Sequence, residues 1–219
     1  MDHTIARALS HVYWIGGSPC SGKSTIADSI ASEMGWTSYR CDDAWYRHEK
    51  IVDPDRHPIF YRLRDATGDA VWMRPVDVQI REELAVYEEE FSLILDDLLA
   101  MPTDRPVVAE GAALLPNLVH DLGIAADRMI WIVPTPEFQV LHYGQRQWRH
   151  DVLATCSDPD QAWANWMQRD IGFAQAVRER ADARDLACIV VDGQTSLAEN
   201  EATVRQQFGL ITDGGGILP

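Results

Sequence analysis

One eight-residue motif constrains the fold of this chain more than any other feature. Residues 17–24 read Gly-Ser-Pro-Cys-Ser-Gly-Lys-Ser and match the pattern G-x-x-x-x-G-K-[ST]. Residues 11–15 before it form a short apolar run typical of a strand, and residues 25–34 after it carry apolar side chains at helical spacing. In this setting, backbone N–H groups and a helix N-terminus can surround a phosphate. The motif therefore predicts an α/β fold with a site for a nucleoside triphosphate.

Several residues of the motif are expected to have distinct roles in binding a triphosphate. Gly17 and Gly22 allow the backbone angles of the turn, Lys23 can reach the β- and γ-phosphates, and the Ser24 hydroxyl can ligate Mg²⁺. A chance match in a glycine-rich turn is the alternative, and the flanking strand and helix argue against it. The residues expected to bind ATP are Gly17, Ser18, Pro19, Cys20, Ser21, Gly22, Lys23, Ser24 and Thr25, with Gly193 from a later turn.

Composition and charge narrow the class of protein further. The chain of 219 residues can bury a full core, and its hydrophobic (46%) and charged (24%) fractions are those of a globular protein. A net charge of −15 disfavours general nucleic-acid binding. The apolar runs are too short to cross a bilayer, and the N-terminus lacks the features of a signal peptide. With four scattered cysteines, we expect a cytoplasmic protein with reduced thiols.

The hydrophobic pattern divides the chain into alternating strands and helices. Strands are expected at 11–15, 37–41, 105–111, 128–133 and 186–191, and helices at 25–34, 76–101, 135–149 and 160–183, with a last helix from residue 196. Residues 44–75 show no steady period, and the tail at 214–219 is expected to be frayed. This alternation predicts a single domain over 1–219 with a three-layer α/β/α fold and a five-stranded parallel sheet.

Acidic residues follow two of the predicted strands. Asp42 and Asp43 come after the second strand, and Glu110 closes the third. Because ligands of such sheets bind at the carboxyl ends of the strands, these carboxylates are candidates for catalysis or for metal binding. Glu110 can orient Mg²⁺-bound water or bind the phosphoryl acceptor. The alternative interpretations are a solvated turn for the aspartates and a favourable helix-start position for the glutamate.

Together these elements resemble the P-loop kinases of nucleosides, nucleotides and small metabolites, and within that group the uridine-kinase branch. Three matches carry the resemblance. Residues 16–25 match the phosphate loop, and 107–111 match an apolar strand that ends in Glu-Gly. Residues 42–46, Asp-Asp-Ala-Trp-Tyr, match the element D-[DS]-[FW]-Y of that branch, although an alanine separates the aspartates from the aromatic pair.

The resemblance implies phosphoryl transfer from ATP, with Mg²⁺, to a hydroxyl or phosphate of a small molecule. It also implies an acceptor-binding insertion, here at about 44–105, and a small lid, here at about 143–160. The first aspartate of the branch's element acts as a base or acceptor clamp, which corresponds to Asp42. Asp43 is the alternative for this task, or it holds Mg²⁺ through water.

Two arginines in the predicted lid are candidates for charge neutralisation during transfer. Arg146 and Arg149 lie three residues apart, so a helix would place them on one face. Arg169 is a further candidate, and ordinary surface arginines are the alternative. For the acceptor we expect a mixture of aromatic and cationic residues that suits an aromatic or anionic molecule, or that packs as a helical flap. The residues chosen for acceptor binding are Trp45, Tyr46, His57, Arg62 and Glu110.

Several related functions stay open at this point. An antibiotic- or sugar-alcohol-modifying kinase would differ only in its acceptor. A nucleotide-binding switch with slow ATP hydrolysis would need no acceptor. The guanine-specifying motif N-K-x-D is absent, which argues against an ordinary GTPase, and the acidic charge argues against a polynucleotide-end kinase. The sequence leaves the acceptor and the oligomeric state open, a homodimer included.

Overall fold

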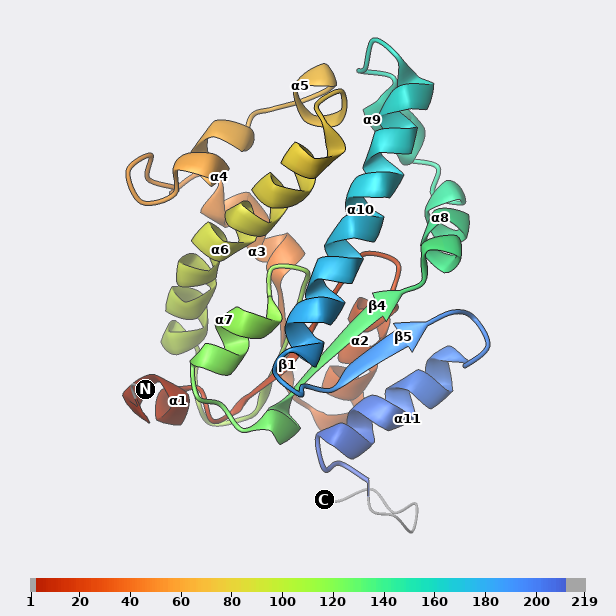
Figure 1. The fold of residues 1–219 in the computed structure, drawn as a ribbon. Helices are drawn as coiled ribbons and strands as arrows, with labels where there is room; N and C mark the ends of the chain where they lie inside the picture. Colours follow the sequence, from red (N-terminus) through yellow and green to blue (C-terminus); the bar gives the residue numbers. More distant parts are fainter. Residues whose placement is uncertain (1–2, 212–219) are drawn as a thin grey trace.

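A parallel β-sheet forms the centre of the molecule (Figure 1). The computed structural model describes residues 3–211, so the tail at 214–219 lies outside the described part. Within that part the sheet has five strands in the order β2-β3-β1-β4-β5, and every neighbouring pair is parallel. The strands are β1 Val12–Gly17, β2 Thr37–Arg40, β3 Val107–Glu110, β4 Met129–Pro134 and β5 Cys188–Val191. The predicted fold class is confirmed.

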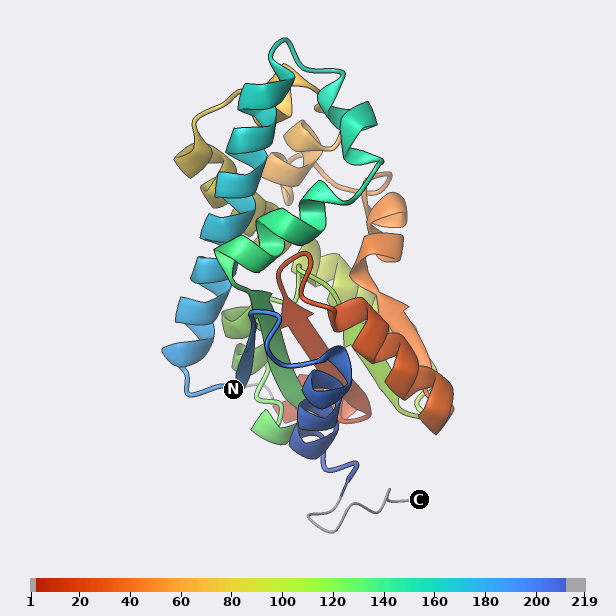
Figure 2. The same ribbon diagram turned by 90° about the vertical axis from the view of Figure 1, so that its right-hand side faces the viewer.

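Alternating side chains of the strands bury both faces of the sheet. On β4, Trp131 belongs to one core together with Phe173, whereas Ile132 belongs to a second core together with Ile26. Helices α6, α7 and α10 cover the first face, and α2 and α11 cover the second (Figures 1 and 2). These helices are α2 Lys23–Met34, α6 Val76–Ala100, α7 Pro116–Asp121, α10 Pro159–Asp182 and α11 Leu197–Gln207.

A second layer of short helices lies beyond the carboxyl ends of the strands, together with the outer ends of α6 and α10 (Figure 1). The segment 44–75, expected to be irregular, contains most of these helices, and α1 was not predicted. The structure also corrects β5, which was predicted as a buried strand, because it is an edge strand with only Val191 fully buried. The remaining helices are α1 His3–Ala8, α3 Cys41–His48, α4 Pro58–Leu63, α5 Asp69–Trp72, η1 Ala126–Arg128, α8 Pro136–Gly144 and α9 Arg149–Leu153.

Contacts between distant parts of the chain hold the short helices in place. The carboxylate of Glu89 on α6 accepts hydrogen bonds from the backbone N–H groups of Ile59 and Phe60 at the start of α4. Trp45 of α3 stacks on Phe60 with a centroid distance of 4.2 Å. No local side chain caps α4, so Glu89 satisfies N–H groups that have no partner within the helix. No helix in residues 3–211 has the length and apolarity needed to cross a membrane.

Candidate active site

The loop between β1 and α2 has the geometry that the motif predicts. Gly17 lies against β4, and a Cβ on it would come within 1.9 Å of the Ile132 carbonyl oxygen. The backbone has positive φ angles at Cys20 (67°) and Gly22 (84°), which turn the chain sharply into the helix. Helix α2 begins at Lys23 rather than at Thr25. Lys23 and Ser24 therefore lie in the first turn, where N–H groups are free to bind an anion.

The next strand places a carboxylate directly beside this helix start. The Ser24 hydroxyl donates a hydrogen bond of 3.1 Å to Glu110 Oε2, and Glu110 pairs with Ile15 across the β1–β3 register. Glu110 is only 2% exposed, and this burial raises the pKa of its carboxyl, although the nearby Lys23 opposes the shift. Glu110 thus lies beside the hydroxyl that is predicted to ligate Mg²⁺, and it does not line the cavity described below.

The two aspartates after β2 lie in different surroundings. Strand β2 runs directly into α3, so both residues lie in the first turn of a helix and not in a loop. Asp42 lines the cavity described below, and it forms no hydrogen bond or ion pair with any residue in 3–211. Asp43 also forms no hydrogen bond or ion pair there, and both aspartates are exposed, but Asp43 does not line the cavity, because neighbouring helical residues point in different directions. Only Asp42 therefore faces the space beside the phosphate loop, and no hydrogen bond within residues 3–211 joins Asp43 to Ser24.

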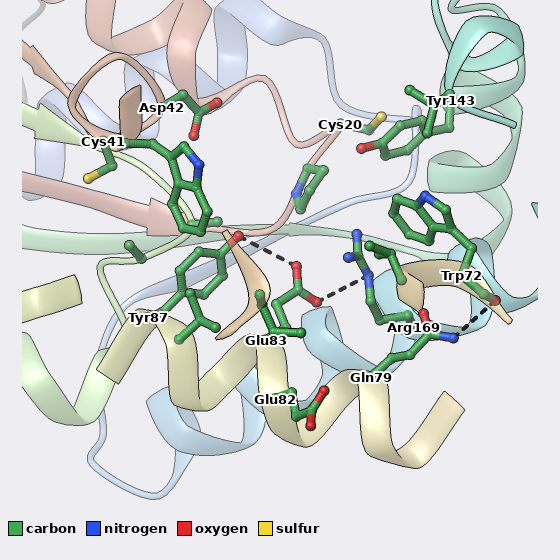
Figure 3. Close-up of a pocket in the computed structure, with 18 of the residues that line it drawn as sticks. Cys20, Cys41, Asp42, Trp72, Gln79, Glu82, Glu83, Tyr87, Tyr143 and Arg169 are labelled. Carbon is green, nitrogen blue, oxygen red and sulfur yellow. Dashed lines mark hydrogen bonds and ion pairs between the residues drawn. The ribbon is translucent and has the colours of Figure 1, made fainter. Parts of the chain in front are cut away.

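One large cavity connects the phosphate loop with the second layer of helices (Figure 3). Its volume is about 1110 Å³. Residues 19–25 line one side, and side chains from α3, α5, α6, α8, α10 and the segment 145–155 complete the wall. Figure 3 shows Asp42 on the same side as Cys20, with Glu83 and Arg169 across the cavity from them. The cavity has room for more than the phosphates of one nucleotide.

The sequence matches no protein-family model and no curated protein. Two solved structures are similar to this chain at low identity. A candidate kinase from Chloroflexus aurantiacus j-10-fl is 15% identical, over 90% of this chain and 97% of its own, with a TM-score of 0.38. TT1252 from Thermus thermophilus is 15% identical, over 92% of this chain and 97% of its own, with a TM-score of 0.47. Such values assign no activity, so the function rests on the residues of this chain.

The two arginines of the predicted lid were expected to share one face of a helix, and the structure contradicts this. Helix α8 ends at Gly144 and α9 begins at Arg149, so the expected continuous helix is broken between them. Arg146 lines the cavity, with its guanidinium 4.7 Å from the centre of the Tyr143 ring and no carboxylate partner in the described chain. Arg149 does not line the cavity, because it packs on Trp163 at 4.7 Å and donates to the Gly144 carbonyl. Only Arg146 is placed to meet a ligand.

The residues chosen for acceptor binding also separate into two groups. Trp45 and Tyr46 line the cavity. His57 does not, because it is buried under α4, where its Nδ1 accepts from the Asp53 N–H and its Nε2 lies 3.3 Å from the Ser92 hydroxyl. Arg62 is exposed and does not line the cavity, although it forms an ion pair of 2.6 Å with Glu82, which does. Both residues therefore hold the insertion together.

Sequence reasoning missed several residues on the far wall of the cavity. Gln79 and Glu83 lie one helical turn apart on α6, and Tyr143 and Trp72 complete this part of the wall. Arg169, considered only as a weak lid candidate, pairs here with Glu83 at 3.3 Å. The usable signal was the helical spacing of Gln79 and Glu83 beside the apolar stripe of α6.

A buried glutamine of α8 forms hydrogen bonds that hold the phosphate loop in place. Gln139 is fully buried, and its Nε2 donates to the Ser18 hydroxyl and to the Pro19 carbonyl, each at 3.1 Å. Ser18 is itself fully buried and does not line the cavity, so it supports the loop and does not face the ligand. Gly193 also lies outside the cavity wall, packed toward Phe138 of α8. Its contact with a nucleotide stays a prediction.

The donor groups of the loop fit a triphosphate with Mg²⁺. Ser21 Oγ is buried without a hydrogen-bond partner among residues 3–211, and the Lys23 ammonium has no carboxylate partner there. Ser24 and Glu110 offer Mg²⁺ a hydroxyl and a carboxylate. No cluster of three or more His, Cys, Asp or Glu suited to a metal ion occurs in that range. Mg²⁺ in general binds through few protein ligands and completes its shell with water and phosphate oxygens.

Proposed function

We propose that this chain is an ATP- and Mg²⁺-dependent kinase that transfers the γ-phosphoryl group to a hydroxyl of a small molecule. One observation carries the proposal. A single cavity is lined by the phosphate loop, by the unpartnered carboxylate of Asp42 and by the unpartnered guanidinium of Arg146. Phosphoryl transfer needs a cationic cradle, a group that orients the nucleophile, and a further cation over the transferring group. These three needs match the three features of the cavity wall.

The residues divide the work of the reaction between them. Lys23, Ser21 and the loop N–H groups bind the phosphates, and Ser24 with Glu110 holds Mg²⁺ directly or through water. ATP supplies the phosphoryl group. Asp42 accepts a hydrogen bond from the acceptor hydroxyl, orients its oxygen, and receives its proton during transfer. Arg146 neutralises charge that develops on the phosphoryl oxygens.

Positioning and charge suffice for this reaction, so no covalent nucleophile is required. Tyr143 and Trp148 flank the Arg146 guanidinium at 4.7 and 5.8 Å and restrain it beside the cavity. The second layer of helices forms the acceptor side of the same cavity, and Trp45 with Tyr46 offers aromatic surface there. Val152 of α9 also lines the cavity, packed with Trp72 and Tyr143.

Acceptor-stimulated ATP consumption tests the proposal. We expect a small hydroxyl compound to raise the rate of ADP formation by the wild-type protein in the presence of Mg²⁺. The Lys23→Ala variant should lose at least about 100-fold of this rate, since the reaction depends on charge at the phosphates. Lys50→Ala, at an exposed lysine that does not line the cavity, serves as the matched control and should keep most of the rate. Slow hydrolysis that ignores every acceptor would instead support a nucleotide-dependent switch.

A further inference from the structure

One wall of the cavity contains amide and carboxylate oxygens that take no part in the mechanism above. It is formed by Trp72 of α5, Gln79 and Glu83 of α6, and Arg169 of α10, which we call the Glu83 pocket (Figure 3). The guanidinium of Arg169 lies over the Trp72 ring at 4.7 Å. All four residues line the cavity that the phosphate loop also lines. A molecule in the acceptor half of the cavity would therefore touch this pocket.

The carboxamide of Gln79 presents a buried acceptor that lacks a donor. Its Nε2 donates to the carbonyl oxygens of Trp72 at 3.2 Å and Arg74 at 2.8 Å. Only the NH₂ group can face two carbonyl oxygens, so these contacts fix the orientation of the amide. Gln79 Oε1 is buried and accepts no hydrogen bond within residues 3–211. Because a buried acceptor without a donor is unfavourable, a ligand that donates to it would bind with a gain in free energy.

The charges of the pocket favour a cation. Arg169 forms ion pairs with two carboxylates, Glu83 at 3.3 Å and the fully buried Asp170 at 2.6 Å. Glu83 Oε2 is the oxygen that lies 3.3 Å from Arg169 Nε and it accepts no further hydrogen bond within residues 3–211, and its other oxygen accepts only a long one, of 3.5 Å, from Tyr87. Burial raises the pKa of Glu83 to about 7; the charge of Arg169 opposes this rise, and the charge of Asp170 adds to it. A ligand cation beside Glu83 would supply the missing positive charge.

The same half of the cavity is poorly suited to an acceptor phosphate. Arg64 pairs with Asp65, Arg74 pairs with Glu82, and Arg169 pairs as described. The carboxylate beside each of these arginines offsets its charge and weakens its attraction for an added anion. By contrast, Lys23 and Arg146 beside the phosphate loop have no carboxylate partner in the described chain. This pairing disfavours the anionic acceptor that was one of the expectations drawn from the mixture of aromatic and cationic residues.

We propose that the acceptor is an alcohol that carries an amino group and no phosphate, and that Gln79 and Glu83 bind the amino group. This inference rests on the proposed kinase function. An ammonium group has three donors, so it can satisfy both Gln79 Oε1 and the free lone pairs of Glu83. The aromatic faces of Trp45, Tyr46 and Tyr87, which also line the cavity, suit the carbon skeleton of an amino sugar or a related amino alcohol.

A panel of matched compounds tests the chemical class. The amino members are kanamycin, glucosamine and ethanolamine, the uncharged members are glucose, ethylene glycol and uridine, and the phosphorylated members are glucosamine 6-phosphate and phosphoethanolamine. We expect an amino member to give the highest kcat/KM and its phosphorylated or uncharged counterpart to give less than about one tenth of it. A preference for a phosphorylated or uncharged member would overturn this inference but leave the kinase function in place. ATP binding without stimulation by any member would reject both.

Substitutions then test whether the two residues recognise the amino group. In Glu83→Gln we expect the preference for the amino member over its uncharged counterpart to fall about tenfold, with the KM for ATP unchanged. Glu88→Gln on the exposed side of the same helix is the matched control and should keep the preference. Equal losses for both compounds in Glu83→Gln would show a merely structural role and contradict the inference.

Gln79→Leu provides an independent variant with its own control. We expect a rise of about five- to tenfold in KM for the amino member, because the bound donor loses its acceptor. Gln175→Leu, at an exposed position of α10, should leave this KM unchanged. Titration of the tryptophan fluorescence with the amino compound, in the absence of ATP, measures the affinity directly and compares the two variants without turnover. An unchanged affinity in folded Gln79→Leu would contradict the assignment of this residue.

Discussion

At the residue scale, the decisive contrast is between two neighbouring aspartates. Both are exposed and without a hydrogen-bond or ion-pair partner in residues 3–211, but only Asp42 lines the cavity. We expect Asp42→Asn to lower kcat at least about 100-fold, because the amide cannot receive the acceptor proton. The affinity for ATP should stay within about twofold, and Asp43→Asn should keep nearly full activity. If steady-state kinetics show that Asp43→Asn, and not Asp42→Asn, lowers kcat, the base is Asp43.

The hydrogen bond between Ser24 and Glu110 leads to a prediction about the Mg²⁺ concentration that activity requires. In Glu110→Gln we expect the Mg²⁺ concentration for half-maximal activity to rise about tenfold or more, because a carboxylate near the ion is lost. Asp104→Asn, at an exposed acidic position just before β3, is the control. Titration of activity with Mg²⁺ at saturating ATP measures the effect. An unchanged requirement would show that Glu110 only supports Ser24.

The raised pKa of Glu83 predicts that the free energy of unfolding falls as the pH rises. Its folded-state pKa is raised from 4.5 to about 7, so the folded state holds its proton over a range in which the unfolded state has lost it. The contribution of Glu83 to the free energy of unfolding is therefore present below about pH 4.5 and is lost as the pH rises toward about 7. Denaturant unfolding should show this loss, on the order of 2 kcal/mol, in wild type and in Glu88→Gln but not in Glu83→Gln. The same slope in Glu83→Gln would contradict the prediction.

At the scale of elements, local signals explain what the sequence could predict. The sheet strands and α2, α6 and α10 have clear periods, and the phosphate loop has a motif, so each was expected close to its observed place. Helix α4 could not be found in this way, since Glu89, thirty residues from Ile59, supplies its cap. The break between α8 and α9 likewise separates Arg146 from Arg149, which spacing alone had joined.

Close packing of β1 against β4 gives a prediction at this scale. A Cβ on Gly16 would come within 2.2 Å of Trp131 Nε1, which donates a hydrogen bond of 2.7 Å to the Leu114 carbonyl. Gly16→Ala should therefore lower the free energy of unfolding by about 2 kcal/mol or more. Gly144→Ala is the control, because a Cβ there would meet no described atom within 4 Å, and it should be neutral or slightly stabilising. Equal stability of the two variants in urea unfolding would refute this packing.

At the scale of the whole molecule, two cations that are unpaired in the described part of this acidic chain face the same cavity. Despite the net charge of −15, Lys23 and Arg146 face the same cavity without carboxylate partners among residues 3–211. The arginines on the acceptor side are paired, so the two halves of the cavity differ in charge. This difference supports our proposal that phosphates bind in one half of the cavity and an uncharged or cationic molecule in the other. Sequence composition cannot show this separation, because it depends on which carboxylate meets each arginine.

The most direct test of the proposed function follows the label of γ-phosphate-labelled ATP in the presence of Mg²⁺ and the acceptor panel. We expect wild-type protein to move the label onto the hydroxyl of an acceptor, with one ADP formed for each acceptor modified. Asp42→Asn and Lys23→Ala should form this product at least about 100-fold more slowly. Label released only as inorganic phosphate, at a rate that no acceptor changes, would contradict the assignment of this chain as a kinase.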